Sequence, residues 1–472
     1  MSAEAALASA APAPSVGWAD LLGEGRAPVL GLVMLGCWVV AADSLVTSTI
    51  MPSVGEALDG FAWFGWAASG FMTGLVVATA TSSWLAERIG LRGAMMLAGA
   101  GFAIGCAMSA AAPGIGLFLA GRVLQGCAAG WVIGLIYVAL AILFPGRHLP
   151  RVFAILTSIW GVATFAGPLL GGLFADAGAW RGVFWLFAAQ GVVFAGASVL
   201  LIPAATARDA GTTLPLRALF LLALGIGALA TASVVGSLGL AVSLAAAGAV
   251  LLVGAIRSDR SRPKGIVPRS APDPAFPLGS AYLTYFFMTA AGVAFALYAP
   301  AMLQHRAGLS ALEAGYLVAI EALAWTLAAL AVAGSGERWR TRFIAIGAAA
   351  ILAGTIAIAV AMNGSSLAAV AAAGATLGAG FGLYSAFLSQ RVIGAFDDGG
   401  RVRGSSAISA ARNSGGALGA AVAAIAANAA GFGDGLSDGN AVWVSWGAFG
   451  SSILFALAGF AFAIRVVRSV QA

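Results

Sequence analysis

Four ionisable side chains lie well inside long apolar stretches of this chain: Asp43, Arg122, Glu321 and Arg412. A charge in hydrocarbon is costly unless it is protonated, paired or facing water, so each of these residues is a candidate for function. A carboxylate in such surroundings can bind and release a proton, and a guanidinium can hold it as a charged partner. The residue types therefore indicate chemistry with protons and charges.

Asp43 and Arg122 are predicted to lie at similar depths. Asp43 is 9 residues before Pro52, where the first apolar stretch ends, which corresponds to about 13 Å of helix. Arg122 is 8 residues after Gly114, where the fourth stretch begins, or about 12 Å. The two side chains can pair if their helices are neighbours. Such a pair could bind protons, or it could be purely structural.

Glu321 is 11 residues after Ser310, about 16 Å into its apolar stretch, and Trp325 follows one turn later on the same face. Three roles are open for this acid. It could be a second protonatable site, it could select cationic substrates, or it could be a protonated acid that is hydrogen-bonded to a neighbouring helix.

The composition excludes several classes of protein. Of 472 residues, 61% are hydrophobic and 9% are charged, which excludes a soluble globular protein and a disordered one. The net charge of +6 does not indicate nucleic-acid binding, because the basic residues lie in loops between apolar stretches. Cys37, Cys106 and Cys127 have no CxxC spacing, and His148 and His305 are the only histidines, so neither a metal site nor a cofactor is expected.

The elements that must position these charges are membrane-spanning helices. About 20 apolar residues are needed to cross a bilayer as a helix, and stretches of that length recur along the chain. The fourteen predicted spans are 28–50, 62–84, 93–112, 115–143, 152–175, 182–203, 215–235, 238–256, 279–301, 312–334, 342–362, 366–390, 404–430 and 441–465.

The orientation follows from the positive-inside rule. If the N-terminus is cytoplasmic, 20 of the 24 Lys and Arg residues fall in cytoplasmic segments. We therefore expect a multi-pass protein of a cell membrane, the inner membrane of a bacterium, with both termini in the cytoplasm. The N-terminal segment 1–27 is expected to be cytoplasmic and lacks the pattern of a cleavable signal peptide.

A basic, proline-rich segment at 257–278 is predicted to be a cytoplasmic linker between two helical bundles. The N-terminal six-helix bundle spans 28–203, an inserted helix pair spans 204–256, and the C-terminal six-helix bundle spans 279–472. An internal repeat supports this division: Glu-Arg-x-x-x-Arg occurs at 87–92 and again at 337–342, each time after the second span of its half.

Four motifs occur in order at the expected spans. They are Asp43-Ser-Leu-Val-Thr-Ser-Thr-Ile-Met-Pro52, Ser83-Trp-Leu-Ala-Glu-Arg-Ile-Gly-Leu-Arg92, Arg122-Val-Leu-Gln-Gly126, and Gly161 followed by Gly167-Pro-Leu-Leu-Gly-Gly172. This set resembles the motifs of the major facilitator superfamily and, within it, of the fourteen-span drug/proton antiporter family. The match is incomplete, since Glu87 stands in place of an aspartate, and Ile320-Glu321 stands where members commonly carry Leu-Pro.

The resemblance implies an all-α polytopic protein with the major facilitator fold, two six-helix halves plus the inserted pair. It implies proton-coupled export of a hydrophobic or amphipathic compound. The compound would bind between the two halves near the bilayer midplane, and the transporter would be a monomer. Asp43, Arg122 and Glu321 are the candidates for proton coupling. Aromatic and methionine side chains offer an adaptable pocket, although side chains of this kind more often pack or face lipid. The candidates for the cavity are Trp38, Trp131, Trp160, Phe287, Met288, Trp325, Tyr384 and Phe387.

The motifs are also expected to control conformation. The loop at 87–92 would bind neighbouring helix ends, unless it is a generic basic loop. Glycines around Pro168 would allow a kink and close helix packing, which is also common in glycine-rich spans. The conformational candidates are Glu87, Arg88, Gly90, Arg92, Gln125, Gly126, Gly161, Gly167, Pro168, Gly171, Gly172, Glu337, Arg338, Arg342 and Arg412.

Other classes of function stay open. A metabolite or lipid transporter of the same fold, working in either direction, is the main alternative. A membrane enzyme would need a cluster of catalytic side chains, and a receptor that does not transport would be expected to add a signalling domain. Neither feature is found. The sequence contains no ATP-binding loop, so an ion gradient is the expected energy source.

Overall fold

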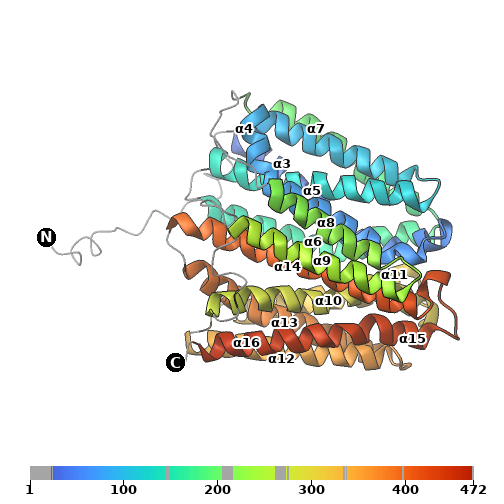
Figure 1. Ribbon diagram of the computed structural model, residues 1–472. Helices are drawn as coiled ribbons and strands as arrows, with labels where there is room; N and C mark the ends of the chain where they lie inside the picture. Colours follow the sequence, from blue (N-terminus) through green and yellow to red (C-terminus); the bar gives the residue numbers. More distant parts are fainter. Residues whose placement is uncertain are drawn as a thin grey trace.

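The computed structural model describes residues 23, 25–144, 148–204, 216–260, 273, 276–332, 335, 337–395 and 398–469. Their regular structure is entirely helical (Figure 1), which confirms the predicted all-α class. Most of segment 1–27, residues 205–215 of the inserted region and most of the predicted linker 257–278 lie outside the described residues.

The N-terminal half contains α3 (Arg26–Ala57), α4 (Phe64–Ala110), α5 (Ile115–Leu143), α6 (Leu149–Asp176) and α7 (Trp180–Leu201). The short 3-10 turn η1 (Phe61–Trp63) precedes α4. Helix α4 covers most of two predicted spans, 62–84 and 93–112. Gly90 lies between them with φ 77° and ψ 155°, a conformation that glycine adopts without the steric cost that other residues carry. The motif glycine is therefore the point at which the chain leaves one helix and enters the next.

The inserted pair is formed by α8 (Leu216–Ala232) and α9 (Leu238–Arg260). The C-terminal half contains α10 (Pro277–Ala307), α11 (Ala311–Val332), α12 (Glu337–Ala361), α13 (Leu367–Gly394) and α14 (Asp398–Ala429), then the turn η3 (Phe432–Asp434). The last span is built from α15 (Ala441–Ser445), a π-helical turn at Trp446–Gly450 and α16 (Ser451–Arg468).

The long helices run side by side, with α3, α4, α5 and α7 in the upper part of Figure 1 and α10, α12, α13 and α16 in the lower part. Within the described residues, 11 helices are long and apolar enough to cross a membrane. Helix α4 counts once among these, and α8 has only 17 residues. The number fourteen therefore stays a prediction, although each predicted span overlaps a helix.

The pair α8–α9 packs on both halves, because α8 contacts α4 and α14. A small apolar cluster joins the pair to α14. Its members are Ile226, Leu229 and Leu252 from the pair and Ala417 and Ala421 from α14. The pair therefore covers the boundary between the halves on this side of the bundle.

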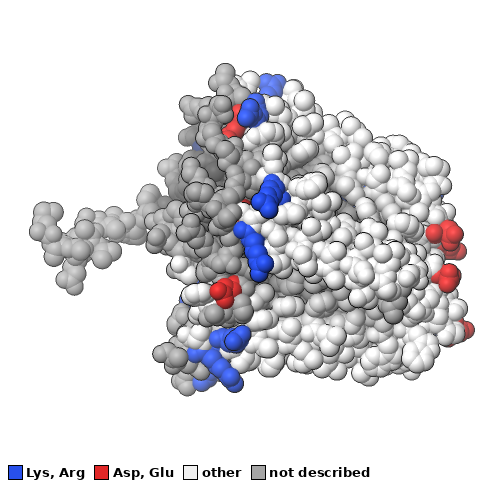
Figure 2. All heavy atoms as spheres, viewed as in Figure 1, with Lys and Arg blue, Asp and Glu red and all other residues white. Residues whose placement is uncertain are grey.

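Charge divides the molecule into two ends. Figure 2 shows the visible Lys and Arg side chains at one end, with a few Asp and Glu side chains among them, and only Asp and Glu side chains at the opposite end. We call these the basic end and the acidic end. The exposed acids near the helix termini of the acidic end are Glu56, Asp59, Asp176, Glu313, Asp434 and Asp438. This distribution matches the positive-inside pattern on which the predicted orientation rests.

Candidate functional site

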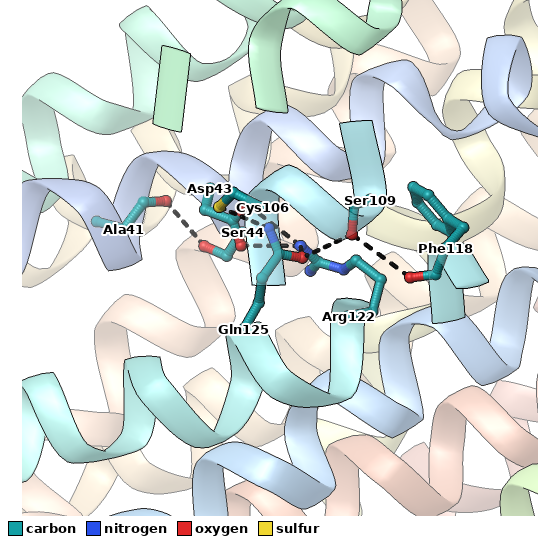
Figure 3. Close-up of polar contacts among 8 residues, drawn as sticks. All are labelled: Ala41, Asp43, Ser44, Cys106, Ser109, Phe118, Arg122 and Gln125. Carbon is teal, nitrogen blue, oxygen red and sulfur yellow. Dashed lines mark hydrogen bonds and ion pairs between the residues drawn. The ribbon is translucent and has the colours of Figure 1, made fainter. Parts of the chain in front are cut away.

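Asp43 of α3 and Arg122 of α5 form a buried ion pair (Figure 3). The Nη1 atom of Arg122 lies 3.0 Å from Oδ2 of Asp43 and 3.2 Å from Oδ1. The side chains are almost fully enclosed, with 1% and 2% of the residue surface exposed. The structure thus brings together Asp43 and Arg122, which were predicted to lie at similar depths and to pair if their helices are neighbours.

The ion pair continues into a polar network between α4 and α5. Nη1 of Arg122 also donates to Oε1 of Gln125 at 2.9 Å, and Nε2 of Gln125 lies 2.8 Å from the sulfur of Cys106. Ser109 donates to the same Gln125 oxygen at 3.4 Å. The guanidinium carbon of Arg122 lies 4.4 Å from the ring centroid of Phe71.

The Nε atom of Arg122 is buried without a hydrogen-bond partner, so the network does not satisfy the guanidinium completely. Cys106, Ser109 and Phe71 are parts of this network that were not predicted from the sequence. The only available signal was the spacing of Cys106 and Ser109, three residues apart and thus on one helical face.

Close packing of α4 on α5 makes the network possible. A Cβ atom at Gly126 would collide with the backbone of Phe71, so only glycine fits there without a shift of the helices. Gly105 of α4 faces Gln125 in the same way, with its ideal Cβ position 2.8 Å from the Gln125 backbone nitrogen. The glycine of the Arg122-x-x-Gln125-Gly126 motif therefore sets the distance between the two helices.

The glycine-rich segment of α6 packs on α3 and also on α11 of the other half. Ideal Cβ positions at Gly167 and Gly171 lie 2.6 Å and 3.0 Å from the Cβ atoms of Leu45 and Thr49. A Cβ atom at Gly172 would collide with the backbone of Leu312. By contrast, no atom lies within 4 Å of the Cβ position at Gly161, so close packing does not explain that glycine.

Two further contacts join the halves at the acidic end. Asp176, the last residue of α6, accepts hydrogen bonds from the backbone N–H groups of Ala311 at 2.8 Å and Leu312 at 3.4 Å. Pro168, inside α6, packs against Gly315 of α11. A Cβ atom added at Gly315 would lie 3.0 Å from the Cβ atom of Pro168.

An aromatic cluster also crosses the boundary at this end. Phe64 of α4 stacks on Tyr298 of α10 with centroids 6.3 Å apart, and both rings contact Phe432 at 5.0 Å and 5.1 Å. Asn428 of α14 donates to the carbonyl oxygens of Ala62 at 2.7 Å and Ser233 at 2.6 Å. These contacts close the acidic end and tie α8 to both halves.

The aromatic candidates of the N-terminal half have different surroundings. The indole N–H of Trp38 donates to Gln190 of α7 at 2.9 Å, and that of Trp131 donates to Thr81 of α4 at 2.9 Å. Trp160 is 45% exposed on α6. Trp38 and Trp131 thus link helices within their own half.

In the C-terminal half, three candidates pack against outer helices of the bundle. Phe287 stacks on Phe462 of α16 at 5.6 Å, Met288 is fully buried, and Phe387 stacks on Phe343 of α12 at 5.8 Å. The role of these three residues in a substrate cavity stays a prediction.

Trp325 and Tyr384 belong to a different group. Trp325 stacks on Phe381 of α13 with centroids 5.0 Å apart, and Phe381 in turn contacts Tyr384 at 5.9 Å. The guanidinium carbon of Arg412 lies 5.3 Å from the centroid of Trp325. Glu321 lies one turn before Trp325, at the point where the backbone of α11 meets Gly378 of α13.

The repeated loop motif has an aromatic contact in each copy. Arg88 lies over Trp84 at 5.8 Å, and Arg342 lies over Trp339 at 5.1 Å. Arg92 is partly buried, and the side chains of Glu337 and Arg338 lie outside the described residues. The predicted conformational role of this loop therefore stays a prediction.

Among the described residues, no group of three or more His, Cys, Asp or Glu side chains is arranged to hold a metal ion. The three cysteines are free thiols. In the arrangement of Asp43, Arg122 and Gln125, protonation of the Asp43 carboxylate would remove its ion pair with Arg122.

Comparisons with known proteins give a consistent result. The family model described as Major Facilitator Superfamily matches residues 33–420. A probable multidrug-efflux transporter of Mycobacterium tuberculosis is 29% identical over 313 residues, which cover 63% of this chain and 64% of that protein. The match thus spans slightly less than two thirds of the relative's length. The tetracenomycin C resistance and export protein of Streptomyces glaucescens is 28% identical over 184 residues, 39% of this chain and 34% of that protein.

Solved structures share the fold at low sequence identity. A bacterial homologue of the human lysosomal transporter Spinster superposes with a TM-score of 0.67 at 14% identity, and the match covers 94% of this chain and 98% of that one. A D-xylose–proton symporter superposes with a TM-score of 0.63 at 15% identity, over 92% and 97% of the two chains.

Proposed function

The chain belongs to the major facilitator superfamily and is a multi-pass membrane transporter, and we propose that it exports hydrophobic or amphipathic compounds in exchange for protons. Export is supported by the relatives, which are named as a multidrug-efflux transporter and a resistance and export protein. We place the protein in a bacterial inner membrane, as a monomer with both termini in the cytoplasm.

The observation that carries proton exchange is the buried Asp43–Arg122 ion pair. Protonation of Asp43 removes its negative charge and leaves Arg122 with a neutral partner, so the attraction between α3 and α5 weakens. Arg122 keeps its bond to Gln125, and its buried Nε atom still lacks a partner. The pair therefore has two states that differ by one proton.

Contacts of α3 provide a route from this pair to the boundary between the halves. Thr49 lies six residues after Asp43 on α3, and it faces both Gly171 of α6 and Gly315 of α11. A movement of α3 that follows protonation of Asp43 would alter the packing where α6 meets α11. We propose that proton binding is coupled in this way to opening and closing of the acidic end.

Alternating access requires that the two ends of the molecule open in turn. In this structure the acidic end is closed by the Asp176, Phe64 and Asn428 contacts. If the basic end faces the cytoplasm, this is the state that receives substrate from inside the cell. Glu321 is proposed as a second protonatable site or as a group that selects cations.

The proposal can be tested with purified protein in liposomes. A pH gradient, inside acidic, is imposed in the presence of a fluorescent amphipathic cation, rhodamine 6G. An exporter that exchanges protons accumulates the dye in the acidic lumen and dissipates the gradient faster when dye is present. Dye movement that follows only the dye gradient, at equal rates with and without a pH gradient, would contradict proton exchange.

A further inference from the structure

Arg412 is a charged side chain inside a span without a charged partner. Within the described part of the chain, the structure gives it no hydrogen bond and no ion pair. Its guanidinium carbon lies 5.3 Å from the centroid of the Trp325 ring. An arginine side chain stays protonated in proteins. A permanent positive charge at membrane depth therefore requires either water or an anion beside it.

The two intramembrane arginines form a natural comparison. Each guanidinium lies over an aromatic ring, Arg122 over Phe71 at 4.4 Å and Arg412 over Trp325 at 5.3 Å. Arg122 has the carboxylate of Asp43 as its counter-ion at 3.0 Å. Arg412 has the ring but, among the residues that the structure describes, no carboxylate as counter-ion.

The acid nearest to this group in the sequence does not provide that counter-ion. Glu321 lies one turn before Trp325 on α11, yet it forms no ion pair with Arg412. Both side chains are partly exposed. The positive charge of Arg412 is thus available to a molecule from outside the protein.

The surroundings of Arg412 favour a flat aromatic molecule. The ring that is partly exposed beside Arg412 is that of Trp325. It is held by stacking on the buried Phe381 with an interplanar angle of 17°, and the buried Tyr384 lies 5.9 Å behind Phe381. Aromatic faces bind other rings by stacking, and a guanidinium binds a carboxylate through two parallel hydrogen bonds. An aromatic carboxylate satisfies both requirements at once.

The site is placed to meet such a molecule on its way in. Trp325 is 7 residues, or about 10 Å, before Val332, where α11 ends at the basic end. The acidic end is closed, so the approach is from the basic end. We propose that Arg412 and Trp325 form a binding site for planar aromatic anions, with Arg412 as the residue that selects the carboxylate. This inference rests on the proposed export function and names one substrate class for it.

Two xanthene dyes with the same ring system and opposite charge test this proposal. Fluorescein carries a carboxylate and is an anion, whereas rhodamine 6G is an esterified cation. Binding of each dye to the purified full chain in detergent is measured by fluorescence anisotropy. Arg412→Gln is expected to weaken fluorescein binding by about tenfold or more, the loss that a charged hydrogen bond implies, and to leave rhodamine 6G binding within about twofold.

Two further variants make the result specific. Arg412→Lys keeps the positive charge but cannot form the bidentate pair of hydrogen bonds. Its affinity for fluorescein is expected to lie between those of the wild type and Arg412→Gln. Arg306→Gln removes an exposed arginine of the same half at the acidic end and is expected to leave both dyes unaffected. Unchanged fluorescein binding in Arg412→Gln would overturn the proposal. Equal loss of both dyes in a variant of unchanged melting temperature would also overturn it.

Binding in detergent is independent of transport, so the two proposals can fail separately. If the wild-type protein exports rhodamine 6G in exchange for protons but does not bind fluorescein, the anion site is wrong and the export function stands. If it binds fluorescein through Arg412 but transports neither dye, the export function is wrong and the anion site stands.

Discussion

The carboxylate of Asp176 accepts a hydrogen bond from the backbone N–H of Ala311 at 2.8 Å, across the boundary between the two halves. Ala311 is the first residue of α11, so an acid of one half binds the N-terminus of a helix of the other. The N-terminus of a helix carries unpaired N–H groups and partial positive charge, which favour a carboxylate. This contact stabilises the closed acidic end.

Asp176→Ala is therefore expected to favour opening of the acidic end. Loss of a carboxylate cap costs about 1 kcal/mol, so the population of the open state should rise about fivefold. The measurement is the distance distribution between spin labels placed at the exposed residues Ala177 and Ala307. Glu56→Gln, which alters another exposed acid of the same end, serves as the control. Identical distance distributions in wild type and Asp176→Ala would show that this contact does not hold the two halves together at the acidic end.

A second prediction concerns the packing of α4 on α5. Gly126→Ala should lower the melting temperature and the yield of folded protein, because the added Cβ atom collides with the backbone of Phe71. Gly116→Ala is the matched control in the same helix, since no atom lies within 4 Å of its Cβ position. The two variants are compared by thermal unfolding in detergent. Equal melting temperatures would contradict the close approach of α4 and α5.

A third prediction concerns the inserted pair. Asn428→Ala removes the hydrogen bonds to Ala62 and Ser233 and should loosen α8 from the rest of the molecule. Hydrogen exchange of peptides from α8 should then accelerate by about fivefold, because the lost bond to Ser233 at the end of α8 contributes about 1 kcal/mol, whereas α12 should be unaffected. Thr376→Ala, which removes only a bond within its own helix, is the control. Unchanged exchange in α8 would mean that Asn428 does not hold the pair.

The role of Glu321 can be decided by removing its charge. Glu321→Gln should weaken transport of cations and preserve that of neutral compounds if the acid selects substrate. It should impair transport of both kinds if the acid carries protons. Transport of a cationic and a neutral dye is compared in liposomes under the same pH gradient. Unchanged transport of every substrate would leave only a structural role for this residue.

Some of the site follows from sequence and some does not. The similar depths of Asp43 and Arg122 are predictable because the rise per residue of a helix gives the depth of each charge, and a lone charge at that depth needs a partner. That their two helices are neighbours is implied only by the resemblance to the major facilitator superfamily. Cys106 and Ser109 are not predictable in the same way. The face that a helix turns to its neighbour depends on packing, and a helix that is apolar on all sides gives no such signal.

The packing partners of the aromatic candidates are not predictable either. Phe287 stacks on Phe462 and Phe387 stacks on Phe343 within the C-terminal half, and the role of both in a cavity stays a prediction. The contact of Asp176 is not predictable for a different reason. Its position at the end of a span is typical of an ordinary loop acid, and its contact with Ala311 joins residues 135 positions apart. The depth of a residue in the membrane follows from its position in the local sequence. The direction of its side chain and its contacts with distant residues depend on how the helices pack.

The measurement that tests the central claim most directly is proton-driven transport by Asp43→Asn. Asparagine keeps an oxygen that can accept from Arg122 but cannot carry the negative charge, so the variant is expected to insert and fold. In liposomes it should still exchange labelled rhodamine 6G down its own gradient, but an imposed pH gradient should no longer drive accumulation. Accumulation at the wild-type rate by Asp43→Asn would contradict proton coupling at the Asp43–Arg122 pair.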